Sequence, residues 1–197
     1  MLLNGVKIGI CFTGSFCTLE SVLPQLKKMK DHGAELYPVF SYAVASTDTR
    51  FTTAKDFREK VEKICNRKVI DSIVDAEQFG PVNKMDLMII APCTGNTLAK
   101  LANSITDTPV LMAAKAHLRN QRPLLLAIST NDALGNNAKN IGLALNMKNI
   151  FFVPFSQDDP INKPNSLVAD MEKILDASLM ALKKTQIHPI IIQEKRL

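Results

Sequence analysis

MDLMIIAPCTGNTLAKLAN, residues 85–103, joins a strand to a helix through one turn, and this segment decides the fold. The almost continuously apolar run Met85–Ala91 predicts a buried strand. Pro92 is expected to end that strand, and Gly95 allows the backbone to approach closely. Thr97 is expected to cap a helix that covers Thr97–Asn103. A buried strand that leads directly into a helix is typical of a parallel sheet.

The same alternation continues on both sides of this segment. Strands that are apolar throughout, separated by amphipathic helices, predict an α/β fold with a mostly parallel sheet covered on both faces, which makes three layers. No internal repeat or low-complexity linker interrupts the chain, so residues 1–197 are expected to form one domain with a tail at 186–197. The predicted strands are Val6–Phe12, Glu35–Phe40, Lys68–Ile70, Met85–Ala91, Leu124–Ser129 and Ile150–Pro154. The predicted helices are Phe16–His32, Thr53–Asn66, Thr97–Asn103, Pro109–Leu118, Asn136–Leu145 and Ser166–Lys184.

The composition excludes several classes of protein. Of the 197 residues, 46% are hydrophobic, which is enough to close a core. The net charge is +5, from 24 basic and 19 acidic residues, but the two kinds are interleaved, and aromatic residues reach only 6% without any Trp. A nucleic-acid partner is therefore not expected. No apolar run approaches the roughly 20 residues of a membrane span, and Met1–Phe12 lacks a signal-peptide pattern, so a cytoplasmic protein is expected.

The cysteines and histidines do not form a metal-binding pattern. The four cysteines include no C-x-x-C pair, and the three histidines are scattered. This spacing does not match zinc, so no metal site is expected. Reduced thiols are expected in a cytosol.

Functional residues are expected where the strands end, because ligands of an open parallel sheet bind beyond the carboxyl ends of the strands. Thr13, Gly14, Ser15 and Phe16 follow the first strand. Hydroxyls and N–H groups beside a glycine turn at a helix start can hold a phosphate. The segment matches neither a Walker A loop nor G-x-G-x-x-G, which disfavours a nucleotide triphosphatase and an ordinary nicotinamide site. A helix cap without a ligand is the alternative interpretation.

Small polar residues also follow the other predicted strands. Ser41 follows the second strand, and the turn that contains Thr94 and Asn96 follows the central one. Ser129, Thr130 and Asn131 follow the strand at 124–128. Because these ends meet at one edge of a parallel sheet, they predict a single binding crevice.

Two irregular segments also indicate a function. Phe155–Asn165 is long for a loop in a compact domain, and such loops are usually functional or mobile. In the tail, the apolar run Ile190–Ile192 is expected to pack on a partner subunit or to add an edge strand.

Three segments carry a resemblance to the FMN-binding flavoprotein family. They are Thr13-Gly14-Ser15, APCTGNTLAK at 91–100 and AISTN at 127–131. The family includes cysteinyl-peptide and phosphopantothenoylcysteine decarboxylases, whose corresponding motifs read P-x-S-A-N-T and A-M-N. Order and spacing agree along nearly the whole chain. Within the family, the chain length and two longer segments, GICFTGSFCTLE at 9–20 and APCTGNTLAKLANSITDTPV at 91–110, resemble the dipicolinate synthase B subunits of spore-forming bacteria.

The resemblance implies a Rossmann-like flavoprotein fold, assembly into homotrimers or dodecamers, and FMN at subunit contacts. It implies that the FMN phosphate meets the loop after the first strand together with Ser41, and that the ring and ribitol face the turn after the central strand. Asn131 would correspond to the asparagine that handles the substrate carboxylate in the decarboxylases. The implied cofactor-binding residues are Thr13, Gly14, Ser15, Phe16, Ser41, Cys93, Thr94, Asn96 and Thr97, and the catalytic candidates are Asn96, Asn131 and Cys93.

Two departures from the family motifs disfavour oxidative decarboxylation of a cysteine. The decarboxylases use a histidine after the second strand, whereas residues 41–92 contain none. Leu134-Gly135 replaces the M-W pair that follows A-M-N. His32, His117 and His188 are expected to be surface or packed residues, and the favoured interpretation of Cys93 is a small lining residue rather than a nucleophile.

The resemblance implies that the chain acts with the A subunit of dipicolinate synthase in the two-electron oxidation of dihydrodipicolinate to dipicolinate. The A subunit is expected to carry the NADP site, and FMN on this chain remains open. The implied place is the cytosol of the mother cell during sporulation. Two alternatives are an FMN-dependent, decarboxylase-like enzyme that acts alone and a non-catalytic regulatory or scaffolding subunit.

Overall fold

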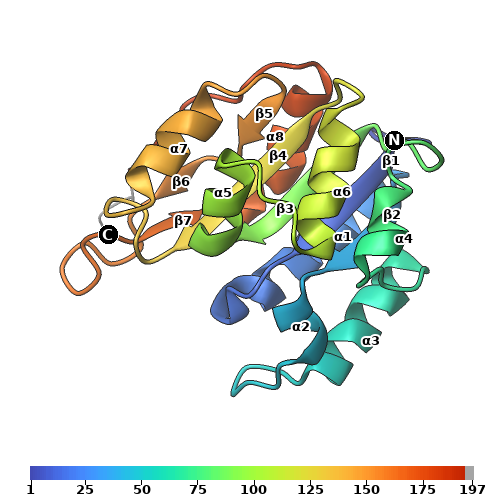
Figure 1. The fold of residues 1–197 in the computed structure, drawn as a ribbon, viewed down its shortest axis with the longest axis horizontal. Helices are drawn as coiled ribbons and strands as arrows, with labels where there is room; N and C mark the ends of the chain where they lie inside the picture. The colour runs from blue at the N-terminus through green and yellow to red at the C-terminus, as the bar shows by residue number, and fades with distance from the viewer. Residues whose placement is uncertain (194–197) are drawn as a thin grey trace.

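The computed structural model describes residues 1–193, and its centre is a seven-stranded sheet (Figure 1). The strands are β1 (Lys7–Phe12), β2 (Glu35–Phe40), β3 (Leu87–Cys93), β4 (Leu124–Thr130), β5 (Ile150–Phe152), β6 (Phe155–Ser156) and β7 (Leu167–Ala169). The α-helices are α1 (Leu19–Asp31), α2 (Tyr42–Ser46), α3 (Ala54–Cys65), α4 (Ile73–Glu77), α5 (Gly95–Ala102), α6 (Pro109–Leu118), α7 (Ala138–Leu145) and α8 (Ile174–Leu182). Short 3-10 turns at Phe16–Thr18 and Met171–Lys173 precede α1 and α8.

The main part of the sheet is parallel, as the sequence predicted. β2, β1, β3 and β4 lie side by side in that order, and β5 also pairs with β4 in parallel. β7 then pairs antiparallel with the end of β4, and β6 pairs antiparallel with β7. The chain moves from β1 outward to β2 and then returns across β1 to β3. The order of the strands therefore reverses between β1 and β3, which is where an open α/β sheet binds its ligands.

Helices cover both faces of the sheet, so the predicted three-layer α/β architecture is confirmed (Figure 1). α1 and α8 contact each other and pack on the strands from one face, with α3 beside α1. α4, α5, α6 and α7 form the layer on the other face, where α4 packs on α6 and α5 packs on α7. β3 is buried along its whole length because both layers meet it, which explains its almost uniformly apolar sequence.

Three phenylalanines consolidate the side of the core nearest to β2. The ring centroids of Phe12, Phe40 and Phe57 lie 5.3–5.5 Å apart, and all three side chains are buried. Burial of each such ring contributes on the order of 1.5–3 kcal/mol. This cluster fixes α3 against β1 and β2, and thereby the loop that leads into α3.

Several predicted boundaries were wrong. Pro92 does not end the central strand, because β3 continues to Cys93 with a shift of register between Ile90 and Cys93. The predicted strand at Lys68–Ile70 is reduced to one isolated bridge between Val39 and Ile70. The short helices α2 and α4 were not predicted.

The predicted helix Ser166–Lys184 also begins too early. Its first residues form β7, because Leu167 and Val168 pair with Ser129 and Thr130 of β4. Asp170 then accepts a hydrogen bond from the backbone N–H of Glu172 and starts the turn that leads into α8. β6 occupies the first two residues of Phe155–Asn165, which the sequence predicted as one long loop, and β7 begins after it.

The described part of the tail adds an edge pairing, one of the two roles expected for it. Ile191 forms a parallel bridge with Phe155 of β6. The Phe155 N–H donates to the Ile190 carbonyl at 2.9 Å, and the Ile192 N–H donates to the Phe155 carbonyl at 3.0 Å. Residues 194–197 of the predicted tail lie outside the described residues.

Candidate functional site

A cavity of about 690 Å³ lies at the carboxyl ends of β1, β3 and β4, and it is open to solvent. Its position includes the β1–β3 switch point, where the topology predicts a ligand. The volume is typical of a site for a small organic ligand. The lining residues come from five segments: Gly14–Cys17, Arg50–Phe51, Thr94–Asn96, Ser129–Asp132 and the β6–β7 region with Asp158, Lys163, Ser166 and Val168.

Thr13 ties the end of β1 to the end of β3. Its hydroxyl donates to the Pro92 carbonyl at 2.7 Å and accepts from the Thr94 N–H at 3.0 Å. The side chain is buried and is not among the cavity-lining residues. Thr13 was predicted as a phosphate contact, but its hydroxyl already holds the two strand ends in register.

Thr94 caps α5, a role that the sequence assigned to Thr97. The Thr94 hydroxyl accepts from the Thr97 N–H at 3.3 Å and donates to the Thr97 hydroxyl at 3.0 Å. The helix consequently begins at Gly95, two residues earlier than predicted. Thr94, Gly95 and Asn96 line the cavity, with Asn96 exposed, whereas Thr97 is buried behind them.

A cluster of hydroxyls connects β1 to β4 across the end of β3. Ser15 Oγ and Ser129 Oγ lie 2.7 Å apart. Thr18 Oγ1 lies 2.9 Å from the Ser15 carbonyl oxygen and 3.4 Å from Ser129 Oγ. Both serines line the cavity. Hydroxyls can both donate and accept, so this wall can reorganise its hydrogen bonds around an anion or an amide.

Gly14 leaves room for a ligand at the start of this wall. A Cβ built on Gly14 would meet no atom closer than 3.5 Å, and the atoms at that distance belong to Ala43 and Phe16. Gly14 and Phe16 both line the cavity. The predicted phosphate loop therefore borders the cavity through Gly14, Ser15 and Phe16.

Asp132 organises the opposite wall, and sequence reasoning missed it. Its two carboxylate oxygens accept from the Thr130 hydroxyl at 2.5 Å and from the Asn137 amide at 2.7 Å. Asn137 in turn accepts from the Asn140 amide at 2.8 Å. A Cβ on Gly95 would lie 2.5–2.7 Å from Thr130 Oγ1, Asn137 Nδ2 and Asp132 Oδ1, so only glycine allows this close approach. The signal in the sequence was the dense run of Asn and Asp around Asn131, of which only Asn131 was selected.

Besides Thr13, three other predicted site residues do not line the cavity. Ser41 is buried and caps α2 by accepting from the Val44 N–H at 3.4 Å. Cys93 is fully buried, and burial raises the pKa of its thiol to about 12. Such a thiol is not ionised near neutral pH, so it is a poor nucleophile. Thr97 is the third, as described above.

The catalytic candidates Asn96 and Asn131 both line the cavity, and both are exposed. They come from different strand ends, one after β3 and one after β4, and the fold brings them to the same crevice. Their catalytic roles stay predictions.

Two loops supply charges to the cavity that the strand-end argument did not include. Arg50 and Phe51 lie between α2 and α3, and Asp158 and Lys163 lie between β6 and β7. Lys163 Nζ is 3.4 Å from Asp158 Oδ2. Burial works against the charged form of Asp158, but the Ser166 hydroxyl and Lys163 outweigh it and lower the pKa of the carboxyl. The sequence marked 155–165 as a functional segment without identifying these residues.

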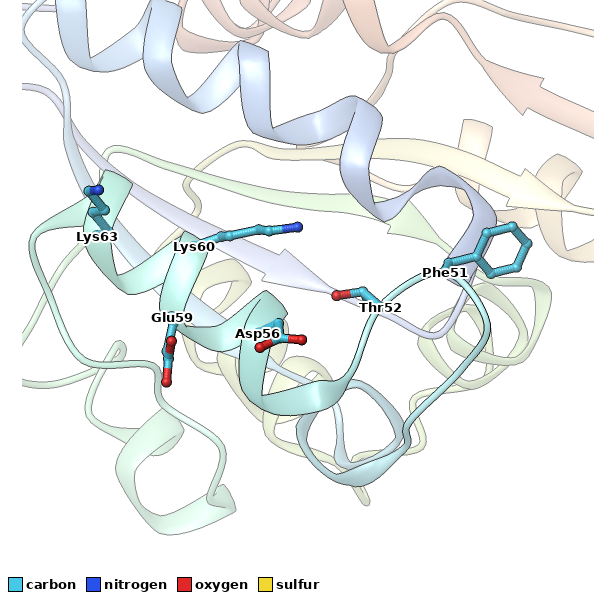
Figure 2. A pocket seen from close by; sticks show the side chains of 6 residues that line it. All are labelled: Phe51, Thr52, Asp56, Glu59, Lys60 and Lys63. Carbon is cyan, nitrogen blue, oxygen red and sulfur yellow. The ribbon is translucent and has the colours of Figure 1, made fainter.

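A second hollow, of about 420 Å³, lies along α3 and shares Phe51 with the strand-end cavity (Figure 2). Figure 2 shows Lys60 and Lys63 on the same helix as Asp56 and Glu59. Lys60 Nζ is already 2.7 Å from Glu20 Oε1. This mixture of charges is typical of a solvated helix surface, so the strand-end cavity is the stronger candidate.

The described residues show neither a metal cluster nor a membrane-spanning helix, and one of their histidines is packed in the core. Within residues 1–193, no three or more His, Cys, Asp or Glu side chains gather in a way that could hold a metal ion. His117 is buried, with Nε2 2.8 Å from the Pro123 carbonyl oxygen, and burial lowers its pKa to about 4. In the same range, none of the helices has both the length and the apolar composition needed to cross a bilayer.

Comparisons with known proteins agree with this architecture. The flavoprotein family model matches residues 2–182. The chain is 50% identical to the dipicolinate synthase B subunit of Bacillus subtilis (strain 168) over 191 residues, which cover 97% of this chain and 96% of that protein.

Solved structures give the same result. The crystal structure of the dipicolinate synthase B subunit from Bacillus halodurans C superposes with a TM-score of 0.90 at 46% identity, covering 98% of this chain and 99% of that one. The FMN-dependent cysteine decarboxylase TvaF from thioviridamide biosynthesis gives a TM-score of 0.66 at 17% identity, with 91% and 99% covered, and shares the fold. The expected resemblance is confirmed, and the chain belongs to the flavoprotein family, in which it groups with the B subunits of dipicolinate synthase.

Proposed function

We propose that this chain is the B subunit of a two-subunit dipicolinate synthase and acts with the A subunit to oxidise dihydrodipicolinate to dipicolinate. The observation that carries the proposal is the 50% identity to a dipicolinate synthase B subunit over nearly the full length of both chains. A shared fold along nearly the whole chain is supported by the TM-score of 0.90 to a second B subunit.

The proposed reaction removes two electrons and two protons from the substrate ring, which becomes aromatic. A hydride passes to NADP⁺, which we place on the A subunit, and the remaining proton passes to a base or to water. This chain would bind the substrate in the strand-end cavity, where Asn96 and Asn131 can hydrogen-bond to carboxylates from two walls. Holding the ring in a fixed orientation beside the acceptor can supply a large part of the rate enhancement.

We also propose that the cavity binds FMN, which can accept or donate a hydride when it is bound. Three observations on this chain fit a flavin: the β1–β3 switch point, the open flank of Gly14 and a polar wall of hydroxyls. Gly14, Ser15 and Phe16 would border the phosphate, and Thr94 and Asn96 would border the rest of the molecule. Thr13, Ser41, Cys93 and Thr97 would support these residues from behind.

The test of flavin binding is an absorbance spectrum of the purified chain between 300 and 550 nm, with and without added FMN. The Gly14→Val variant is the informative mutant, because a branched side chain would fill the flank that now has no atom closer than 3.5 Å. We expect a perturbed flavin spectrum with the unmodified chain and none with Gly14→Val. An FMN spectrum that does not change when the chain is added would refute flavin binding. The oxidation would then be carried out at the NADP site that we place on the A subunit.

The test of the main proposal is reconstitution with the A subunit of the same organism, followed by detection of dipicolinate and of NADPH. We expect product only when both subunits are present. Asn96→Ala should abolish product, whereas Asn136→Ala should not, because Asn136 is equally exposed but lies outside the cavity lining. Full activity of the isolated A subunit would favour the scaffolding alternative, and decarboxylation by this chain alone would favour the decarboxylase alternative.

We further propose that the chain functions as one domain in the mother-cell cytosol of a sporulating bacterium and forms a homo-oligomer. The joining of all seven strands in one sheet supports the single domain. Exposed apolar side chains on and beside α7, namely Leu134, Leu143 and Leu145, support contact with another copy of the chain. Light scattering of the purified chain tests the oligomer, and a monomeric mass would refute it.

A further inference from the structure

The strand-end cavity contains one cation whose charge is not matched within the described chain. Arg50 and Lys163 are the two cationic residues among those that line the cavity. Lys163 is paired with Asp158 at 3.4 Å. Arg50 has no carboxylate oxygen within 4.0 Å among residues 1–193.

A comparison within the protein shows that this arrangement is unusual. Three arginines place their guanidinium over an aromatic ring: Arg50 over Phe51 at 4.8 Å, Arg58 over Phe40 at 5.5 Å and Arg67 over Tyr37 at 4.0 Å. Arg58 also pairs with Asp71 at 2.5 Å, and Arg67 pairs with Glu35 at 3.1 Å. Among the described residues, Arg50 is the one stacked arginine that contacts an aromatic ring but does not also pair with a carboxylate.

Stacking holds the guanidinium of Arg50 but does not use its hydrogen-bond donors. The ring attracts the face of the cation, while the five N–H groups of a guanidinium point outward in its plane. Two of these N–H groups have the spacing to donate parallel hydrogen bonds to two oxygens of a carboxylate or a phosphate. Figure 2 shows Phe51, the ring under Arg50, on the loop that leads into α3.

The two carboxylates that line the cavity are already satisfied. Both oxygens of Asp132 accept hydrogen bonds from Thr130 and Asn137, and Asp158 is paired with Lys163. Neither carboxylate is free to pair with Arg50, whose exposed side chain is left open to an anionic ligand.

We propose that Arg50 is the residue of this cavity that binds an oxyanion of the ligand, and that this oxyanion is a carboxylate of the pyridine dicarboxylate. The choice of carboxylate rests on the proposed function. A flavin phosphate would present the same chemistry to the same guanidinium, and the experiment separates these two sources.

The experiment titrates the purified chain by calorimetry with dipicolinate, inorganic phosphate and FMN, each in metal-free buffer because dipicolinate chelates cations. Arg50→Gln is compared with Arg67→Gln, a matched control that removes an arginine stacked on a ring away from the cavity. We expect Arg50→Gln to weaken dipicolinate binding by on the order of 10- to 100-fold. Arg67→Gln should stay within about twofold of the unmodified chain, and Arg50→Lys should fall between, because lysine keeps the charge without the fork.

The other outcomes are also decisive. A loss confined to phosphate and FMN would assign the same oxyanion site to the flavin. The proposal is overturned if Arg50→Gln binds all three ligands as the unmodified chain does, if Arg67→Gln loses as much, or if the unmodified chain binds none of them. Equal melting temperatures of Arg50→Gln and the unmodified chain establish that the change acts on binding.

Reconstitution with the A subunit separates this inference from the proposed function. If the unmodified pair forms no dipicolinate but Arg50→Gln still weakens binding of dipicolinate, the function fails and the oxyanion site stands. If the pair forms dipicolinate with the same KM for Arg50→Gln and for the unmodified chain, and the titrations also agree, the oxyanion site fails and the function stands.

Discussion

Replacing Gly95 with alanine should destabilise the protein although alanine is the better helix former. Gly95 is the first residue of α5 and lies against the hydrogen-bonded group formed by Thr130, Asp132 and Asn137. The added Cβ would be placed 2.5 Å from Thr130 Oγ1, 2.6 Å from Asn137 Nδ2 and 2.7 Å from Asp132 Oδ1. All three distances are shorter than an ordinary van der Waals contact, so these side-chain ends must shift, and we expect the shift to cost at least one of the hydrogen bonds to the carboxylate.

The expected cost follows from three contributions. A hydrogen bond to a charged group contributes roughly 1.5–3 kcal/mol, and overpacking adds about 1–3 kcal/mol. Alanine recovers about 1 kcal/mol of helix propensity. We therefore expect Gly95→Ala to lower the free energy of unfolding by about 1.5–5 kcal/mol, which urea denaturation followed by circular dichroism would measure.

Two other glycines are matched controls. Gly142 lies within α7, and a methyl group added to it would have no atom within 4 Å, so Gly142→Ala should stabilise the protein by up to about 1 kcal/mol. Gly14→Ala meets only ordinary contacts at 3.5 Å and should change stability by less than about 0.5 kcal/mol. If Gly95→Ala proves as stable as Gly14→Ala, the argument that the Asp132 group needs a glycine is wrong.

Three further predictions concern other parts of the structure. His117 has a pKa of about 4 in the folded protein and about 6.5 in the unfolded chain, so the free energy of unfolding should fall by up to about 3 kcal/mol as the pH drops from 6.5 to 4. His117→Gln should remove that part of the pH dependence in denaturation curves, and an unchanged dependence would contradict the prediction. Thr13→Val leaves a carbonyl and an N–H at the end of β3 without their partner and should cost about 2 kcal/mol, whereas Thr13→Ser should cost far less; equal losses would argue against the hydroxyl. In the native protein, a thiol reagent should label exposed Cys17 quickly and Cys93 only on unfolding, which mass spectrometry of the labelled peptides would check.

Sequence patterns were sufficient for the architecture because they follow burial. The strand at 85–91 is almost entirely apolar because helices cover both of its faces. Sheets that are covered on both faces are typically parallel. Pro109–Leu118 was predicted with both ends correct because proline can occupy the first turn of a helix and Thr108 caps it. The strand-end rule then brought Ser15, Asn96 and Asn131 to one cavity although they are far apart in the sequence.

The remaining features depend on tertiary contacts that have no local signature. Leu167–Ala169 forms a strand because the end of β4 offers it a partner, and the same residues continue a helical pattern in the sequence. The Asp132 group depends on a close approach to Gly95 from another strand end. Arg50 reaches the cavity from a loop after α2, a helix that was not predicted, so a rule limited to strand ends could not include it.

The edge of β4 that faces away from β3 is divided between two partners. Its first three residues pair in parallel with β5, and its last two pair antiparallel with β7. Among residues 1–193, two strand-pairing positions therefore join the β6–β7 hairpin to the parallel sheet, and the segment between these strands contributes to the cavity. Insertions, deletions and changes of charge within residues 157–166 should therefore have little effect on the free energy of unfolding. Divergence in ligand preference among related chains should concentrate in this hairpin, while the β1–β3 switch point stays the same.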